Sequence, residues 1–253
     1  MHVERLGDHG PRLLLVHGSI APGWATWSAQ RELAEEGYRL VVPHRSGYPP
    51  NPPLERVDFE VQAREIAELI EPGTHLVGHS YGGVVSLLAA ALVSDRVRSL
   101  TVIEPPALGL ARGNPAAEAM IDRVNAILDT PGTMREAFAR FVAAVGSSAK
   151  VPETLTPAQE ASIRATLAER PPFEAVFDFA TLRAAAIPVL VVSGDHDPAF
   201  EAVCDVITRE LDADRAVIPG AGHSAQRTGG AFNRRLRQHL DGAERAAARA
   251  APS

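Results

Sequence analysis

The chain has 253 residues and a formal net charge of −6, with acidic and basic residues interspersed. A nucleic-acid surface would show a basic patch, so we predict no nucleic-acid partner. The single cysteine, Cys204, excludes an intrachain disulfide and a cysteine-rich metal site. The first residues lack an apolar signal region and no apolar run approaches about eighteen residues, so we expect a cytoplasmic protein with no membrane partner.

Short apolar runs alternate with helical patterns along most of the chain. The runs are continuous, as expected for strands covered on both faces of a parallel sheet. They predict strands at 13–16, 40–42, 76–77, 100–103, 189–192 and 216–218, with helices at 26–36, 59–70, 83–92 and 201–211. This rhythm predicts an α/β fold with a mostly parallel, doubly wound sheet and reactive groups beyond the carboxyl ends of its strands.

One interval, residues 105–186, shows only helical segments separated by Pro and Gly. Thr156, Pro157 and Gln159 fit a helix start with a capping box. We interpret the interval as a helical cap inserted over the reactive edge of the sheet. The core then comprises residues 1–104 and 187–244, and residues 245–253, rich in Ala and Arg, are expected to form a flexible tail.

The most informative segment is Gly78-His79-Ser80-Tyr81-Gly82, which lies between a predicted strand and a predicted helix. A serine with glycine two residues before and after it fits a tight turn that holds the serine in strained backbone geometry. Such a turn projects the hydroxyl into open space at the start of a helix, where free amides favour negative charge. This context predicts that Ser80 is a nucleophile.

A serine hydroxyl needs a base to take its proton, and the base needs a partner that orients it and stabilises its charge. Two strand ends offer these groups. The strand at 189–192 leads into Gly194-Asp195-His196-Asp197-Pro198, and the strand at 216–218 leads into a glycine-rich loop that contains His223. The order along the chain is therefore Ser80, Asp197, His223.

Together these motifs, with the early His17-Gly18 after a strand, resemble the α/β-hydrolase superfamily over essentially the whole chain. The resemblance implies Ser80 as nucleophile, His223 as general base and then acid, and Asp197 as the orienting carboxylate. It also implies an oxyanion hole made of the backbone N–H groups of Tyr81 and Ser19.

The acid has alternatives. Asp195 is most simply a turn former, and Glu104, after the strand at 100–103, takes the acid's place in some members of the superfamily. His17 is expected to brace its loop, and His79 to sit beside Ser80, rather than to react. A metal at Asp195, His196 and Asp197 is not expected, because three successive residues do not easily converge on one ion. The glycines of the first loop lack dinucleotide-binding spacing, so we predict no cofactor and no metal.

We therefore expect a cofactor-free serine hydrolase that acts on a carboxylic ester, lactone or thioester through an acyl-enzyme. The alternative is an enzyme of the same fold with different chemistry: a carbon–carbon bond hydrolase, a hydroxynitrile lyase, a cofactorless haloperoxidase-like enzyme or a cyclase. A non-catalytic ligand-binding module is a third hypothesis. Apolar residues in the interval 105–186 predict a small-molecule substrate with an apolar acyl or ring system.

Overall fold

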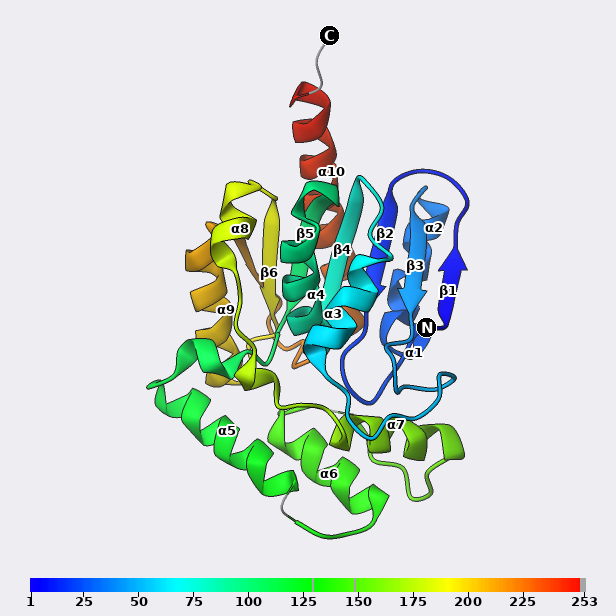
Figure 1. The fold of residues 1–253 in the computed structure, drawn as a ribbon, viewed down its shortest axis with the longest axis vertical. Coiled ribbons are helices and arrows are strands. Elements are labelled where there is room, and N and C mark those ends of the chain that lie inside the picture. Colours follow the sequence, from blue (N-terminus) through cyan, green and yellow to red (C-terminus); the bar gives the residue numbers. More distant parts are fainter. Residues whose placement is uncertain (129, 148, 251–253) are drawn as a thin grey trace.

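The computed structural model describes residues 1–128, 130–147 and 149–250, and a seven-stranded sheet forms its centre (Figure 1). The order across the sheet is β1-β3-β2-β4-β5-β6-β7, and β1 alone runs antiparallel to its neighbour. The strands are β1 (Val3–Leu6), β2 (Arg12–Val16), β3 (Arg39–Pro43), β4 (Thr74–His79), β5 (Val97–Ile103), β6 (Val189–Ser193) and β7 (Asp214–Val217). The predicted α/β fold with a mostly parallel sheet is confirmed, and each of the six predicted strands overlaps one of β2–β7.

Helices connect the strands and cover both faces of the sheet. They are α1 (Trp24–Trp27), α2 (Glu32–Glu35), α3 (Phe59–Ala67), α4 (Tyr81–Leu92), α5 (Pro115–Leu128), α6 (Met134–Ala144), α7 (Pro157–Leu167), α8 (Phe179–Ala184), α9 (Pro198–Leu211) and α10 (Gly230–Ala250). Short 3-10 turns are η1 (Ser28–Arg31), η2 (Ser94–Arg96), η3 (Leu108–Ala111), η4 (Pro172–Glu174) and η5 (Ala225–Thr228). The single helix expected at 26–36 is therefore divided among α1, η1 and α2.

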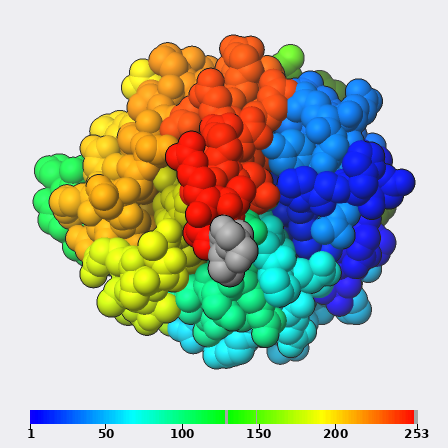
Figure 2. All heavy atoms as spheres, turned by 90° about the horizontal axis from the view of Figure 1, so that it is seen from above, coloured from blue at the N-terminus to red at the C-terminus, as the bar shows by residue number. Residues whose placement is uncertain are grey.

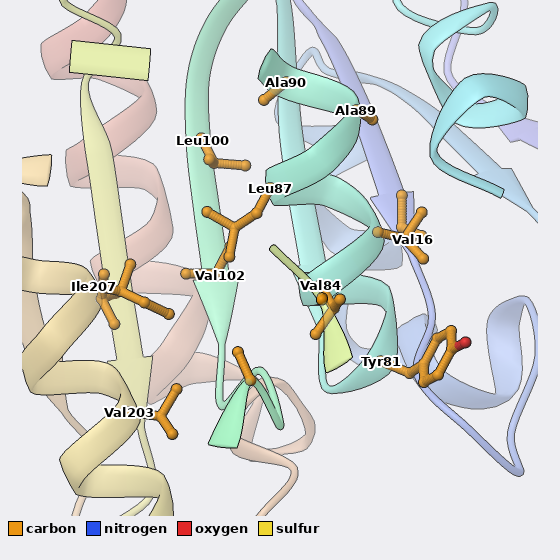
Figure 3. Close-up of a cluster of buried hydrophobic side chains, with 14 of the residues drawn as sticks. Val16, Tyr81, Val84, Leu87, Ala89, Ala90, Leu100, Val102, Val203 and Ile207 are labelled. Carbon is orange, nitrogen blue, oxygen red and sulfur yellow. The ribbon is translucent and has the colours of Figure 1, made fainter. Parts of the chain in front are cut away.

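Two apolar cores lie on opposite faces of the sheet because successive strand residues point in opposite directions. In β2, Leu14 and Val16 belong to the core that contains α3, α4 and α9. Leu13 and Leu15 belong to the other core, which is covered by α10 and the α1–α2 segment. Figure 3 shows the first core, in which Val84 and Leu87 of α4 lie between Val16 of β2 and Val102 of β5. This packing fixes α4, and with it the residue that precedes α4, against the centre of the sheet.

In the carboxyl-terminal segment, α10 continues to Ala250, and residues 251–253 lie outside the described part. The flexible tail at 245–253 stays a prediction. Seen from above, the last turns of α10 lie at the middle of the molecule, between early segments on one side and the segments around α8 and α9 on the other (Figure 2). No helix in the described ranges combines the length and the apolar character that crossing a bilayer requires.

The interval 105–186 contains helices and, among its described residues, no strand. Helices α5, α6 and α7 form a layer beyond the carboxyl ends of the strands, which we call the α5–α7 layer (Figure 1). Capping boxes at Thr133 and Thr156 start α6 and α7. Helix α8 lies apart from this layer, because Phe179 and Leu182 pack into the core that contains α4 and α9. The division into a core and an inserted cap stays a prediction.

Candidate active site

Ser80 occupies the turn between β4 and α4 in the strained geometry expected from its motif. Its φ of 53° and ψ of −126° lie in a region that non-glycine residues rarely adopt. A Cβ on Gly78 would overlap the Gly82 carbonyl and the Ser86 hydroxyl, and a Cβ on Gly82 would overlap the backbone of His17. The two glycines are therefore required by close approach of the chain, and the turn they permit holds Ser80 in one orientation.

His223 lies on the loop after β7 and brings its imidazole to Ser80. Its Nε2 lies 2.9 Å from the Ser80 Oγ and accepts the hydroxyl proton in a hydrogen bond. Its Nδ1 lies 2.8 Å from Oε2 of Glu104 and donates to it. The three side chains come from residues 80, 104 and 223, and they form one continuous chain of hydrogen bonds in which Ser80 is 5% exposed and His223 is 6% exposed.

Glu104 directly follows β5 and is fully buried. Its Oε1 accepts a 2.6 Å hydrogen bond from the Gly194 N–H and lies 3.2 Å from Nδ1 of His196. Burial alone would raise the pKa of Glu104, but the contacts with His196 and His223 and the Gly194 N–H outweigh it and lower the pKa to about 2. The carboxylate is thus held as an anion beneath the imidazole.

The structure corrects the assignment of the acid, because the carboxylate bonded to His223 belongs to Glu104 and not to Asp197. Asp197 caps the amino end of α9, where its Oδ1 accepts from the Ala199 N–H at 2.8 Å. Its Oδ2 accepts from Arg123 at 3.1 Å. Asp195 is exposed and has a φ of 55°, which agrees with a turn former. Glu104, one of the two alternatives named from the sequence, is the residue that the fold brings to His223.

Two further histidines surround the site. His79 is buried, and its Nε2 donates to the backbone carbonyl of His223 at 2.9 Å. Burial lowers the pKa of His79 to about 3, so its ring is neutral and braces the loop that carries His223. His196 contacts two segments: its Nε2 lies 3.2 Å from the carbonyl of Val145, which follows α6, and its Nδ1 faces Glu104, which follows β5. Burial would lower the pKa of His196, but the Glu104 carboxylate outweighs it and raises that pKa.

The loop after β2 also lies against Ser80. A Cβ on Gly18 would lie 2.8 Å from the Ser80 Cβ, so this loop touches the turn directly. Ser19 and Ser80 line the same pockets. The N–H of Tyr81 is the first of α4 and has no acceptor within its own helix. The assignment of the Tyr81 and Ser19 N–H groups as oxyanion donors stays a prediction.

A buried ion pair holds this loop and was not foreseen from the sequence. Arg45 is 0% exposed and donates to Oε1 of Glu169 at 2.7 Å. Arg45 also donates to the carbonyls of His17 and Gly18, both at 2.9 Å. Glu169 in turn accepts from the Ser19 hydroxyl at 2.5 Å. The pair therefore joins the end of β3, the loop after β2 and the residues that follow α7.

No local pattern predicts that ion pair, because its members are separated by 124 positions. His17 completes the arrangement as a neutral brace. Burial lowers the pKa of His17 well below its usual range, its Nδ1 donates to the Gly18 carbonyl, and its Nε2 accepts from the Arg45 N–H at 2.9 Å. This agrees with the expectation that His17 supports the loop.

Among the residues that the structure describes, two groups of side chains bring donor atoms within 4.8 Å of one another, as a metal ion would require: Glu104 with His196 and His223, and Glu4 with His2 and His44. The contacts already described account for the first group. In the second, His44 bonds to the Pro49 carbonyl through Nδ1 and to Glu4 through Nε2, so these two hydrogen bonds account for its geometry. Neither group needs an ion to explain it.

Comparison with known proteins finds that the chain is similar to several hydrolases. The chain is 32% identical over 97 residues to a carbendazim hydrolyzing esterase of Nocardioides sp. (strain SG-4G), covering 36% of this chain and 40% of that protein. It is 31% identical over 151 residues to a pimeloyl-[acyl-carrier protein] methyl ester esterase of Aeromonas salmonicida (strain A449), covering 57% of this chain and 58% of that protein. The matched regions thus span less than two thirds of these relatives.

Solved structures share the fold over nearly the whole chain. A structure from work on carboxylesterases of Nitrososphaera gargenis superposes with a TM-score of 0.71 at 17% identity, covering 97% of this chain and 95% of that one. A hydrolase from Oleispira antarctica gives a TM-score of 0.72 at 17% identity, covering 94% of both chains. The model of the alpha/beta hydrolase family matches residues 13–235. The chain therefore belongs to the alpha/beta hydrolase family.

Proposed function

We propose that the protein is a serine hydrolase that cleaves a carboxylic ester, lactone or thioester of a small molecule through an acyl-enzyme. The observation that carries this proposal is the continuous hydrogen-bonded chain from Ser80 through His223 to Glu104. Ser80 and His223 line a pocket of about 300 Å³, which could hold a substrate. A hydroxyl, an imidazole and a buried carboxylate in this order form the arrangement that activates serine for acyl transfer.

In the proposed reaction, the Ser80 Oγ attacks the carbonyl carbon while Nε2 of His223 takes its proton. The Glu104 carboxylate holds the imidazole in the tautomer that accepts this proton and stabilises the imidazolium that forms. The N–H groups of Tyr81 and Ser19 would donate to the oxyanion. His223 then gives its proton to the leaving oxygen or sulfur, and a water molecule repeats the sequence to release the acid and restore Ser80.

Relatives of the chain support the reaction class. Two are esterases by name, the carbendazim hydrolyzing esterase and the pimeloyl-[acyl-carrier protein] methyl ester esterase. Another is a bifunctional epoxide hydrolase of Sus scrofa, 26% identical over 138 residues. Serine at position 80 favours acyl transfer over epoxide opening, because the epoxide hydrolases of this fold carry aspartate at the position that Ser80 occupies in the turn.

The test is labelling of the full chain with a fluorophosphonate together with turnover of p-nitrophenyl esters. We expect stoichiometric labelling at Ser80, and Ser80→Ala should abolish labelling and lower kcat by roughly 10⁴- to 10⁶-fold. Ser28→Ala, the same change at an exposed serine, serves as the control. Labelling without turnover of esters, lactones or thioesters would point instead to a lyase, cyclase or carbon–carbon bond hydrolase.

A further inference from the structure

The larger pocket beside Ser80 has cationic side chains on its wall and, among the residues that the structure describes, no carboxylate. Lys150 and Arg227 line it together with apolar residues such as Phe138 and Val142. An adjoining cavity of about 630 Å³ is lined by the same two cations, again with no carboxylate among its described residues. Both positive charges therefore border the space next to Ser80.

This charge pattern is opposite to that of the whole chain, whose formal net charge is −6. Lys150 is the only lysine in the sequence. Within the described ranges, neither Lys150 nor Arg227 lies within 4.0 Å of a carboxylate oxygen, whereas many other arginines form ion pairs. Both side chains are exposed, and Arg227 is fixed at the rim by a 3.0 Å hydrogen bond to the Ala25 carbonyl. Unpaired cations beside a pocket attract anions.

A second, smaller pocket of about 70 Å³ is also lined by Ser80. Its wall is largely apolar and includes Pro106, Val124, Ile127 and Leu167. Glu169 also borders it, but its charge is paired with Arg45. At roughly 10–15 Å³ for each water-sized group, this space holds about five to seven such groups. The smaller pocket thus fits a short apolar chain.

The position of the general acid decides which part of an ester enters which pocket. His223 must lie beside the leaving oxygen to protonate it. His223 and His79 line the larger pocket, whereas Tyr81, one of the two residues whose N–H groups are the expected oxyanion donors, lines only the smaller one; Ser19, the other, lines both. The alcohol part of the substrate then lies in the larger pocket with the two cations, and the acyl part lies in the smaller pocket.

We propose that the substrate is an ester of a short apolar acid with an alcohol that carries a carboxylate or phosphate group, and that Lys150 and Arg227 bind this anion. The inference rests on the proposed hydrolase function. It narrows that function to a substrate class, because it assigns the charge to the alcohol side and a small size to the acyl side of the scissile bond.

The experiment compares kcat/KM of the full chain for 4-acetoxybenzoate, its neutral methyl ester and 4-acetoxyphenyl phosphate. We expect at least one anionic ester to be preferred over the neutral one. Lys150→Met and Arg227→Gln should each lower the ratio of anionic to neutral kcat/KM by roughly fivefold, as for exposed charge pairs, and high salt should lower it too. Comparing ratios cancels the intrinsic reactivity of each ester. Arg245→Gln, at an exposed arginine of α10, should leave the ratio unchanged.

The outcomes separate this inference from the hydrolase proposal. Turnover of the neutral ester with no anionic preference, or ratios that neither variant changes, would overturn the substrate class while leaving the hydrolase intact. A preference for mono-p-nitrophenyl glutarate over p-nitrophenyl butyrate that depends on Lys150 and Arg227 would overturn the assignment of the charge to the alcohol side. If the wild-type protein turned over none of these esters, that result would instead count against the hydrolase function itself.

Discussion

The imidazole of His223 donates to the Glu104 carboxylate at 2.8 Å, although the two residues lie 119 positions apart. Glu104 reaches this place because β5 is the neighbour of β4, whose last residue precedes Ser80. The Ser80 N–H donates to the Ile103 carbonyl at 2.8 Å, which ties the turn to the residue before Glu104. Ser80 and Glu104 are thus positioned by one pair of adjacent strands.

This relationship predicts different effects for two carboxylates. Glu104→Gln should lower kcat for a p-nitrophenyl ester by about 10⁴-fold, because the amide no longer stabilises the imidazolium or fixes its tautomer. Asp197→Ala should change kcat little and cost about 1 kcal/mol of unfolding free energy through loss of the α9 cap. Steady-state kinetics and urea unfolding measure both. A larger loss of kcat in Asp197→Ala than in Glu104→Gln would restore Asp197 as the acid.

The low pKa of Glu104 predicts a loss of stability in acid. Its pKa is about 2 in the folded protein, against a usual value of 4.5, so the folded state favours the ionised carboxylate. This contribution is fully present above about pH 4.5 and is lost as the pH falls from 4.5 towards 2. Urea unfolding of the wild type and Glu104→Gln should therefore give free energies that converge over this window. Glu153→Gln, at an exposed carboxylate, should show no such convergence.

The buried pair of Arg45 and Glu169 predicts that one conservative substitution lowers the free energy of unfolding strongly. Glu169→Gln leaves the Arg45 guanidinium buried without its counter-charge, which should cost about 3–5 kcal/mol of unfolding free energy. Glu174→Gln removes an exposed contact with Arg170 and should stay within about 1 kcal/mol. Equal unfolding free energies for the two variants would show that the buried pair contributes little.

Two glycines give a matched test of the turn at Ser80. Gly82→Ala places a Cβ against the backbone of Val16 and His17, so we expect a loss of about 1–3 kcal/mol of stability and a marked fall in kcat. Gly242→Ala on α10 meets no atom within 4 Å and should stabilise the protein by up to about 1 kcal/mol with unchanged kcat. Thermal unfolding and ester turnover check both. An active, stable Gly82→Ala protein would contradict the role given to close packing.

Local sequence patterns were enough to predict the sheet and the Ser80 turn. The five residues from Gly78 to Gly82 predict the Ser80 turn, and continuous apolar runs predict the buried strands. Strand β1 was missed because its four residues, Val3–Leu6, are too short and too mixed to show a period. It is recognisable only through its antiparallel pairing with β3.

The acid and the loop-holding network needed the three-dimensional arrangement. Asp197 lies in a loop that resembles the family motif, yet the fold uses its carboxylate to cap α9. Which strand-end carboxylate reaches His223 depends on strand order and loop geometry, and neither is visible in a linear motif. The one sequence signal for Glu104 was its place immediately after a predicted strand. Arg45 and Glu169 had no such signal, because burial of a charge pair depends on packing between distant segments.

The contact between Arg45 and Glu169 also limits how this protein can be recombined with others of its family. A chimera that replaces α5–α7 with a segment from another hydrolase would keep Arg45, and it would keep Glu169 as the counter-charge only if the exchange ended before residue 169. Crossover points placed between Leu167 and Glu169 preserve the pair, and later ones require the donor to supply an acidic residue at the same place. A junction placed before Glu169 therefore leaves the buried ion pair of such a chimera intact.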